Sequence, residues 1–437
     1  MSESPLKLQI DTQSWDIVPL KSVSVFIKDG THGTHERVHA GVPLLSAKNI
    51  SPFGRIMIDE DDSLISEEEY HKIHSKYELS KGDLLLTVVG TLGRSALISS
   101  DKRFSIQRSI GVIRCSESNV KPEFLYQFTG TDYFQSQLIL RSNATAQAGI
   151  YLGELAKIEV PCPPLPEQQK IAAILSSVDD VIEKTRAQID KLKDLKTGMM
   201  QELLTKGIGA DGKPHTEFKD SPVGRIPTSW RLQALGDIFD FKNGVNKDKT
   251  AFGHGLPIIS YKNVYVGGGI TDSDLSALVE MNDSELERFR VNYGDVFFTR
   301  TSETPDEIGF ANVYLGNRDD VVFNGFVIRG RQRTQTFDSG FLKYAFQSNA
   351  VRKQMMDNSK FTTRAGISGE SLGLIKITIP DISEQEAIAS SLDSVHNRIK
   401  RAKDKLQSCQ SLKKALMQDL LTGKVRVNVE DKEAAVG

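Results

Sequence analysis

The stretch PLPEQQKIAAILSSVDDVIEK, residues 164–184, recurs in altered form as DISEQEAIASSLDSVHNRIKR, residues 381–401. Corresponding residues in the two copies, such as Ile171 and Ile388, are 217 positions apart. Solenoid repeats are only about 20 to 50 residues long and stack on their neighbours. The long offset therefore indicates a duplicated half-chain and not a solenoid.

Both copies carry an apolar or small residue at alternating steps of four and three, which is the heptad pattern of a coiled-coil helix. One lysine interrupts the pattern at the same place in each copy, Lys196 in the first and Lys413 in the second. The residues predicted to form the seam between the two helices are Ile171, Leu175, Val178, Ile182, Ile189, Leu192, Leu203, Ile388, Leu392, Val395, Ile399, Leu406, Leu416 and Leu420. The sequence therefore predicts two long helices of one design.

End signals support these helices. Ser383 and Glu386 fit a capping box at the start of the second helix, and Gly207 and Gly423 suit the helix ends. A helix over residues 167–205 would be about 58 Å long at about 1.5 Å per residue. An apolar seam of this length is best buried against its duplicate in an antiparallel pair. The alternative is that each helix packs only on its own domain.

Composition bounds the rest of the chain. Its 437 residues are 39% hydrophobic and 26% charged, which is typical of a soluble chain with several cores. Three cysteines without ligand spacing make disulfides unexpected, and neither an apolar signal core nor a membrane-length apolar run is present. We expect a cytoplasmic protein. The net charge of −2 means that any DNA-binding surface must be local.

The segments that precede the helices correspond more loosely. LLSAKNI (44–50) parallels IISYKNV (258–264), and both halves carry apolar alternation around a Gly-Asp turn. We therefore predict an α+β fold, with two similar mixed α/β domains separated by the antiparallel helix pair. The predicted parts are a first domain (1–163), a first helix (164–207), a linker (208–229), a second domain (230–381), a second helix (382–424) and a tail (425–437).

Taken in order, several strings resemble a known family. PCPPLPEQQKIAAIL (161–175), LLTKGIG (203–209) and SPVGRIPTSW (221–230), followed by the second cycle, are similar to the specificity subunit of type I restriction-modification systems over nearly the whole chain. The second copy departs from the pattern because DIS (381–383) replaces PLP (164–166). This departure concerns the rigidity of the second junction and leaves the heptads unchanged.

The resemblance implies two target-recognition domains, each of which reads one half of a bipartite, asymmetric DNA sequence. It also implies that two methyltransferase subunits, which would use S-adenosylmethionine, dock on the helices, and it allows two restriction subunits to join them. The chain itself would then be a non-catalytic recognition subunit without a cofactor of its own.

Candidate catalytic motifs in the chain are weak. GTLGRS (90–95) is not a Walker A motif, and the acidic string TPDE (304–307) is better explained as a turn. His32, His35 and His39 lie close together without cysteine or a second acidic ligand, so we expect no metal site there. They form either a polar loop or a DNA-contacting one.

Base recognition needs paired donors and acceptors, whereas lysines, hydroxyls and backbone amides hold phosphates, and loops present such groups best. The candidate DNA-contacting residues are Thr31, His32, Thr34, Lys48, Asn49, Arg94, Gln107, Arg108, Arg141 and Gln147 in the first domain, and Asn243, Asn246, Lys262, Asn263, Arg300, Asn324, Thr362 and Arg364 in the second. The duplicated pairs Lys48/Lys262 and Asn49/Asn263 are expected near phosphates. Unlike residues, such as Arg94 set against the surroundings of Arg300, are expected to discriminate bases.

Two other functions fit parts of the pattern. One is a coiled-coil assembly protein whose domains bind proteins and no DNA, which the near-neutral charge allows. The other is the recognition subunit of a related bipartite type II nuclease-methyltransferase. Association with a methyltransferase separates the first alternative from the specificity subunit, and DNA cleavage on both flanks of the site would favour the second.

Overall fold

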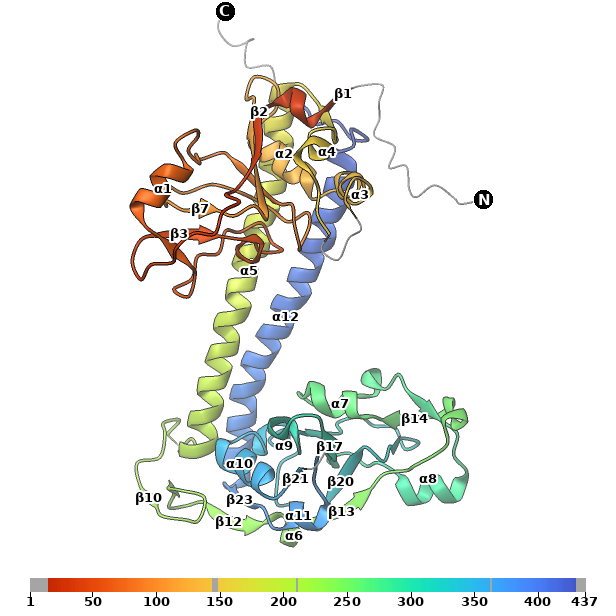
Figure 1. Cartoon of the computed structure of the whole chain (residues 1–437). Helices are drawn as coiled ribbons and strands as arrows, with labels where there is room; N and C mark the ends of the chain where they lie inside the picture. Colours follow the sequence, from red (N-terminus) through yellow and green to blue (C-terminus); the bar gives the residue numbers. More distant parts are fainter. Residues whose placement is uncertain (1–14, 144–147, 210, 362–363, 430–437) are drawn as a thin grey trace, which may run out of the picture. The chain divides into compact units, whose positions relative to one another are not determined.

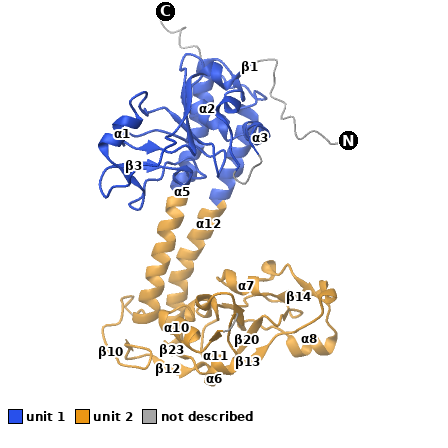
Figure 2. Ribbon diagram, viewed as in Figure 1, with its two compact units in different colours: residues 1–185, 405–437 blue, residues 186–404 orange. Residues whose placement is uncertain are grey.

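The computed structural model describes residues 15–143, 148–209, 211–361 and 364–429 (Figure 1). It forms two compact units, residues 1–185 with 405–437 and residues 186–404, coloured separately in Figure 2. The first predicted domain lies in unit 1 and the second in unit 2. Each unit combines mixed strands and short helices with parts of both long helices.

Unit 1 is built around an antiparallel sheet in the order β2-β8-β5-β6, with a smaller sheet β4-β3-β7 and the pair β1-β9. In the smaller sheet β3 and β7 are parallel. Its elements are β1 (Asp16–Pro19), η1 (Leu20–Val23), β2 (Ser24–Asp29), β3 (Val42–Leu45), η2 (Ala47–Asn49), β4 (Leu64–Ile65), α1 (Glu67–Ile73), β5 (Leu84–Thr87), β6 (Ser95–Leu97), β7 (Ser105–Ile106), β8 (Ile110–Cys115), α2 (Pro122–Thr129), α3 (Asp132–Leu140), α4 (Leu152–Leu155), β9 (Glu159–Cys162) and the first half of α5 (Leu165–Lys206).

Unit 2 repeats this topology with sheets β13-β20-β16-β18 and β15-β14-β19 and the pair β12-β23, and it adds a sheet β17-β22-β21. Again one pair, β14 with β19, is parallel. Its elements are β10 (Phe218–Lys219), β11 (Ile226–Pro227), β12 (Arg231–Ala234), α6 (Leu235–Ile238), β13 (Phe239–Asn243), η3 (Lys249–Ala251), β14 (Phe252–Ile259), α7 (Tyr261–Val266), η4 (Asp272–Asp274), β15 (Leu278–Val279), α8 (Asp283–Phe289), β16 (Val296–Thr299), β17 (Thr301–Ser302), η5 (Pro305–Glu307), β18 (Ala311–Val313), β19 (Val322–Phe323), β20 (Val327–Gln332), α9 (Leu342–Ala345), α10 (Asn349–Asp357), β21 (Lys360–Phe361), β22 (Ala365–Gly366), α11 (Gly369–Gly373), β23 (Lys376–Ile379) and the first half of α12 (Ile382–Leu420).

The central strands explain why both halves of the chain contain short uninterrupted apolar runs. Every residue of β5 and of β16 is buried. Leu84 and Leu86 belong to one core, which also contains residues of α5, whereas Leu85 belongs to a second core on the other face of the sheet. Because successive strand residues point to opposite faces, a sheet that is covered on both sides needs apolar residues throughout.

The residues of the predicted seam lie on the buried side of both helices. All of them are buried, except for Val178, Leu203, Leu406 and Leu416, which are half-buried. Both interpretations of the seam apply, to different parts of the helices. Ile171 lies in the core of unit 1, where Leu421, one residue after α12, joins it. Ile388 lies in the core of unit 2, where Leu204 of α5 joins it.

The two helices also contact each other directly within unit 2. Leu192 of α5 forms a separate cluster with Val395 and Ile399 of α12. Within each unit, the beginning of one helix lies beside the end of the other, so the pair is antiparallel as predicted.

The repeated Glu-Gln dipeptide at each helix start is a buried anchor that the sequence did not single out. Gln168 accepts a hydrogen bond from the backbone of Lys121 at 2.8 Å, and Gln385 accepts one from the backbone of Asp338 at the same distance. Both glutamines are fully buried. The shared bonds show that the two domains attach to their helices in the same way.

The preceding glutamates complete this anchor with an indole and a residue that follows the other helix. In unit 1, Glu167 accepts from the Trp15 ring at 3.3 Å and from Arg426 at 2.7 Å. Residue 426 belongs to the predicted tail, so the beginning of the tail takes part in the packing of unit 1. In unit 2, Glu384 accepts from the Trp230 ring at 3.0 Å and lies 2.9 Å from the ring of His215.

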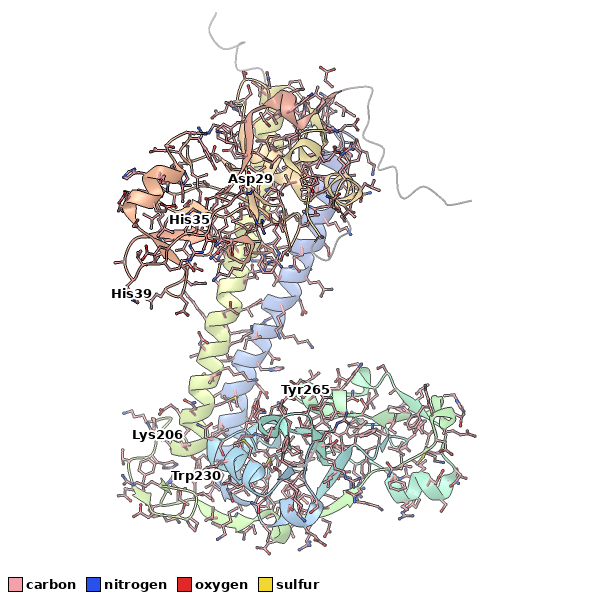
Figure 3. All side chains as sticks on the ribbon, in the orientation of Figure 1. Asp29, His35, His39, Lys206, Trp230 and Tyr265 are labelled. Carbon is pink, nitrogen blue, oxygen red and sulfur yellow. The ribbon has the colours of Figure 1, made fainter. Side chains whose placement is uncertain are left out.

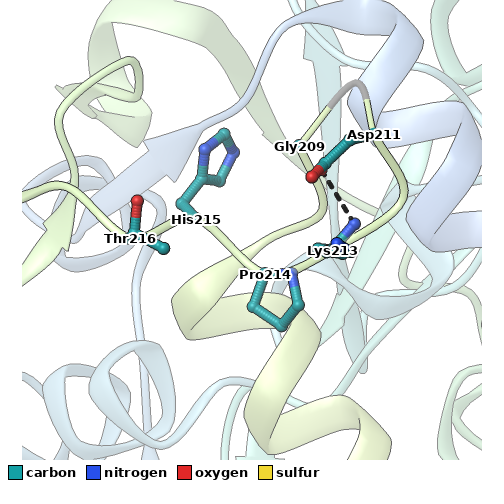
Figure 4. A pocket seen from close by; sticks show the side chains of 6 residues that line it. All are labelled: Gly209, Asp211, Lys213, Pro214, His215 and Thr216. Carbon is teal, nitrogen blue, oxygen red and sulfur yellow. Dashed lines mark hydrogen bonds between the residues drawn. The ribbon is translucent and has the colours of Figure 1, made fainter.

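Most described residues of the predicted linker, 208–229, are exposed or half-buried, but the segment contains local structure. It contains the antiparallel pair β10-β11, and Ile226 is buried. Around residues 209–216 it folds into a turn in which the carboxylate of Asp211 accepts from the backbone of Lys213 at 3.0 Å (Figure 4). The backbone N–H of Gly209 donates to Lys213 at 2.7 Å, so the turn is closed by the main chain as well.

Candidate nucleic-acid interface

In the first domain, three loops meet where the parallel strands β3 and β7 end. The backbone N–H of Gln107 donates to Leu45 at 2.8 Å, and the backbone N–H of Arg108 donates to Thr31 at 3.0 Å. A Cβ atom on Gly30 would lie 2.1 Å from the Ile106 carbonyl oxygen, so only glycine permits this approach. We call residues 30–33, 46–50 and 107–109 the first strand-end surface.

The second domain builds the same arrangement where β14 and β19 end. Asn324 donates its backbone N–H to Ile259 at 3.1 Å, and Val245 exchanges backbone bonds with this loop, as Thr31 does in the first domain. A Cβ on Gly244 would lie 2.0 Å from the Asn324 carbonyl oxygen. We call residues 244–246, 259–263 and 324–326 the second strand-end surface.

Most of the predicted DNA-contacting residues therefore come together, although they are scattered in the sequence. The first surface contains Thr31, His32, Lys48, Asn49, Gln107 and Arg108, and the second contains Asn246, Lys262, Asn263 and Asn324. Asn243 directly precedes the second surface. Arg94 reaches the first surface through a hydrogen bond to the Ile50 carbonyl at 3.4 Å, and Arg300 reaches the second through one to Gly325 at 3.3 Å.

The duplicated asparagines are corrected to structural residues. Asn49 is 2% exposed, and its amide donates to Met57 at 3.0 Å and to Asp62 at 2.8 Å. Asn263 likewise closes a capping box with Ser260 and donates to the Asp274 carbonyl at 2.8 Å. The serine three residues before each asparagine is the signal that could have shown this, because Ser-x-x-Asn fits the reciprocal pattern of a cap.

The duplicated lysines differ in their electrostatic partners. Lys48 lies 2.8 Å from Asp62, and this hydrogen bond raises the pKa of Lys48. Burial would raise the pKa of Asp62, but the bonds from Lys48 and Asn49 outweigh burial and lower it. Lys262 is exposed and, among the described residues, has no carboxylate within 4.0 Å.

The expected pairing of Arg94 with the surroundings of Arg300 is wrong in register. The Arg94 carbonyl accepts from the last residue of β5 at 2.8 Å, and the Phe310 carbonyl accepts from the last residue of β16 at 2.8 Å, so these two positions correspond. Arg300 instead takes the place of Val88, one residue after the strand. An insertion between these positions in the second copy hid the correct alignment.

This insertion forms a cleft of about 380 Å³ beside the second strand-end surface. The cleft is lined by Tyr261, Tyr265, Thr301, Ser302, Glu303, Glu307, Phe326 and Arg364. Glu307 lies in the predicted TPDE turn and accepts from the Tyr265 hydroxyl at 2.8 Å (Tyr265 is labelled in Figure 3). Arg364 lies 3.7 Å from Glu303. The alternation of polar and apolar residues in the sequence did not identify the aromatic residues that line this cleft.

The histidines of the first domain have separate partners. His32 lies 2.7 Å from Asp29, and His35 lies between Thr31 and Glu69. Asp29, His35 and His39 are labelled in Figure 3. His39 and Thr34 are exposed. Within the described residues, no group of three histidine, cysteine or acidic side chains is arranged to hold a metal ion.

The remaining candidates lie elsewhere. Arg141 is half-buried at the end of α3. Gln147 and Thr362 lie outside the described residues. Burial raises the pKa of Cys115 to about 12 and that of Cys162 to about 11, so neither is an activated thiol. No helix in the described part of the chain is both long enough and apolar enough to cross a bilayer.

Comparison with known proteins follows the same division into two halves. The family described as type I restriction modification DNA specificity domain matches residues 19–194 and 227–408. The MjaVIII specificity subunit of Methanocaldococcus jannaschii is 27% identical over 80% of this chain and 80% of its own length. The EcoKI specificity subunit of Escherichia coli is 22% identical over 88% of this chain and 82% of its own length.

A solved structure has the same fold. The crystal structure of the type I restriction-modification S subunit from M. genitalium superposes with a TM-score of 0.58 and 16% identity, and the match covers 93% of this chain and 96% of that chain.

Proposed function

This chain belongs to the family of type I restriction modification DNA specificity domains, and from that premise we propose that it is the DNA-recognition subunit of a type I restriction-modification complex. Each domain reads one half of a bipartite, asymmetric DNA sequence with its strand-end surface. The chain contributes recognition and assembly, and its partners contribute the chemistry.

The observation that carries this proposal is that the two domains share one backbone arrangement but differ in the side chains at their strand-end surfaces. Both domains bring their loops together at the end of a parallel strand pair, with glycine at the point of closest approach. At equivalent positions on these edges, Thr31 of the first domain corresponds to Val245 of the second, and Arg94 corresponds to Phe310. Two copies that keep the frame and change the side chains at these positions suit the reading of two different base sequences.

We further propose that two methyltransferase subunits, which use S-adenosylmethionine, dock on α5 and α12, and that restriction subunits join them. Exposed apolar side chains on the helices support docking: Val181 is 39% exposed, Leu195 46% and Leu412 52%. Large apolar side chains left on the surface of a helix are favourable to cover with a partner.

The test is to co-express the chain with its methyltransferase and map methylated bases across a genome. The expected result is a two-part asymmetric motif that disappears when this chain is omitted. Replacing the insertion 301–309 should change only one half of the motif. If methylation does not depend on the chain, the alternative function of a coiled-coil assembly protein is favoured instead. Cleavage on both flanks of the site would favour a type II enzyme.

A further inference from the structure

Three side chains in the first domain form a continuous hydrogen-bonded relay from α1 to the first strand-end surface. Glu69 Oε1 lies 2.7 Å from His35 Nδ1, and His35 Nε2 lies 2.6 Å from Thr31 Oγ1. The side chain of His35 is only 8% exposed, whereas its neighbour on the strand-end surface, Arg108, is exposed. The relay therefore starts on a helix and ends at the edge where DNA is proposed to bind.

The chemistry of the three groups sets the direction of each hydrogen bond. An ionised carboxylate only accepts, and the hydrogen bond from His35 holds the pKa of Glu69 below its usual value. The Nδ1 atom of His35 therefore carries a proton. In the neutral imidazole, Nε2 is then an acceptor, so the Thr31 hydroxyl gives its only proton to the ring. What remains on Thr31 Oγ1 is acceptor capacity alone.

We propose that, with the imidazole of His35 neutral, these hydrogen bonds make Thr31 a hydrogen-bond acceptor, so that it selects a base with an exocyclic amino group in one half-site. In the major groove, adenine N6 and cytosine N4 are donors, whereas guanine and thymine present acceptors. Glu69 and His35 are positioning residues in this scheme. The inference rests on the proposed function, because it assigns a reading role to the same strand-end surface.

Two features favour base reading over phosphate holding. A phosphate oxygen is itself an acceptor, so a hydroxyl whose proton is already donated cannot bind it. The relay also belongs to one copy only: Val245, which takes the place of Thr31 in the second domain, has no hydroxyl. Residues that bind the DNA backbone, which is the same in both half-sites, would be expected in both domains. Residues that discriminate bases would be expected in only one domain.

The test uses the complete complex with its methyltransferase and oligonucleotides carrying the mapped motif. Each adenine or cytosine of the first half-site is replaced in turn by purine or pyrimidin-2-one, which lack the amino group. The wild-type complex should bind one of these oligonucleotides about fivefold more weakly, which is the effect of one neutral hydrogen bond of about 1 kcal/mol. In Thr31→Val, which keeps the shape and removes the hydroxyl, that difference should vanish.

A second variant reverses the relay. In Glu69→Lys the ammonium can only donate, so Nδ1 must accept and Nε2 must carry the proton. Thr31 then regains a free proton, and the preference at that position should move towards guanine or thymine. The matched control is Glu68→Lys, which makes the same charge change at an exposed neighbour on α1 and should leave the preference unchanged.

The outcome separates this inference from the proposed function. If Thr31→Val retains the full difference between natural and amino-free bases, or if the base that depends on Thr31 is guanine or thymine, the acceptor assignment is wrong. The bipartite motif of the wild-type complex would still stand in that case. Discrimination in the other half-site reports whether each variant is folded, and it should equal that of the wild type.

Discussion

At the scale of single residues, duplication does not guarantee equal roles. Lys48 and Lys262 hold the same place after a strand, yet Lys48 is paired with the buried carboxylate of Asp62 and Lys262 has no such partner among the described residues. A lysine that binds a phosphate releases condensed counterions from the DNA. A lysine that is already paired with a carboxylate releases fewer of these counterions. The equal contribution that the sequence suggested for the two lysines is therefore replaced by an unequal one.

The two lysines should differ in the salt dependence of DNA binding. We expect Lys262→Ala to weaken binding on all sequences and to reduce the slope of log Kd against log salt by about 0.9, the effect of one phosphate contact. Lys48→Ala, the matched substitution in the other domain, should reduce the slope by less. Titrations of labelled duplex at several salt concentrations measure both slopes. Equal slopes for the two variants would contradict the effect of Asp62.

At the scale of the elements, the two lysines that interrupt the heptad seam have different partners. In unit 1, Lys413 lies 2.6 Å from Asp179, which also accepts from Gln127. In unit 2, Lys196 lies 3.5 Å from the ring of His396, which occupies the equivalent position to Asp179. Polar residues in a seam fix register at a cost in stability, and that cost is greater where the partner is not an anion.

Restoring the missing anion should stabilise unit 2. His396→Asp would place a carboxylate opposite Lys196, in surroundings where Lys343 and Lys400 are also positive and the one facing carboxylate, Asp393, is already paired with Lys343. We expect a gain of about 1 kcal/mol at neutral pH, within the range of partly exposed ion pairs. Thermal unfolding should show a midpoint higher by about 2–4 °C.

The pH dependence of stability provides the control for this substitution. Burial, and then the charge of Lys196, lowers the pKa of His396 in the folded chain. Below about pH 6.5 the unfolded chain therefore binds a proton that the folded chain resists, and the wild type loses stability as pH falls. The advantage of His396→Asp should widen as the pH falls from about 7.5 to about 6, across the pKa of a free histidine. A constant difference would show that His396 does not titrate as described.

At the scale of the whole molecule, the chain closes each unit with residues from distant parts of the sequence. Residue 426 of the tail completes the anchor around Glu167 in unit 1, and residue 204 of α5 lies in the core of unit 2. The two long helices thus take part in both cores. If the chain reads two half-sites as proposed, the length of these helices is expected to set the spacing between the half-sites.

Shortening both helices tests that spacing hypothesis. Deleting residues 186–192 from α5 and 400–406 from α12 removes one heptad from each and keeps the seam in phase. One heptad is about 10 Å of helix, or about three base pairs of DNA, so the unread gap in the methylated motif should shorten by about that amount. An active complex with an unchanged gap would refute the hypothesis.

Much of the fold could be predicted because its signals are local and periodic. The heptads of α5 and α12 and the apolar runs of β5 and β16 reflect burial that each element must achieve wherever it packs. The candidate interface was predicted only in part. Asn49 was taken for a DNA contact because its buried partner Asp62 lies in another loop, and the insertion near Arg300 concealed which residues correspond.

By itself, the sequence determined that this protein is a duplicated chain with two long seam helices and two similar domains. Periodicity and a constant offset survive in the residue order without any contact being known. The tertiary structure decided which polar side chains make hydrogen bonds that stabilise the fold and which remain available at the strand ends. It also decided that Thr31, His35 and Glu69 form one chain of hydrogen bonds. Hydrogen bonds between loops depend on where strands end in space, and residue order does not encode that place locally.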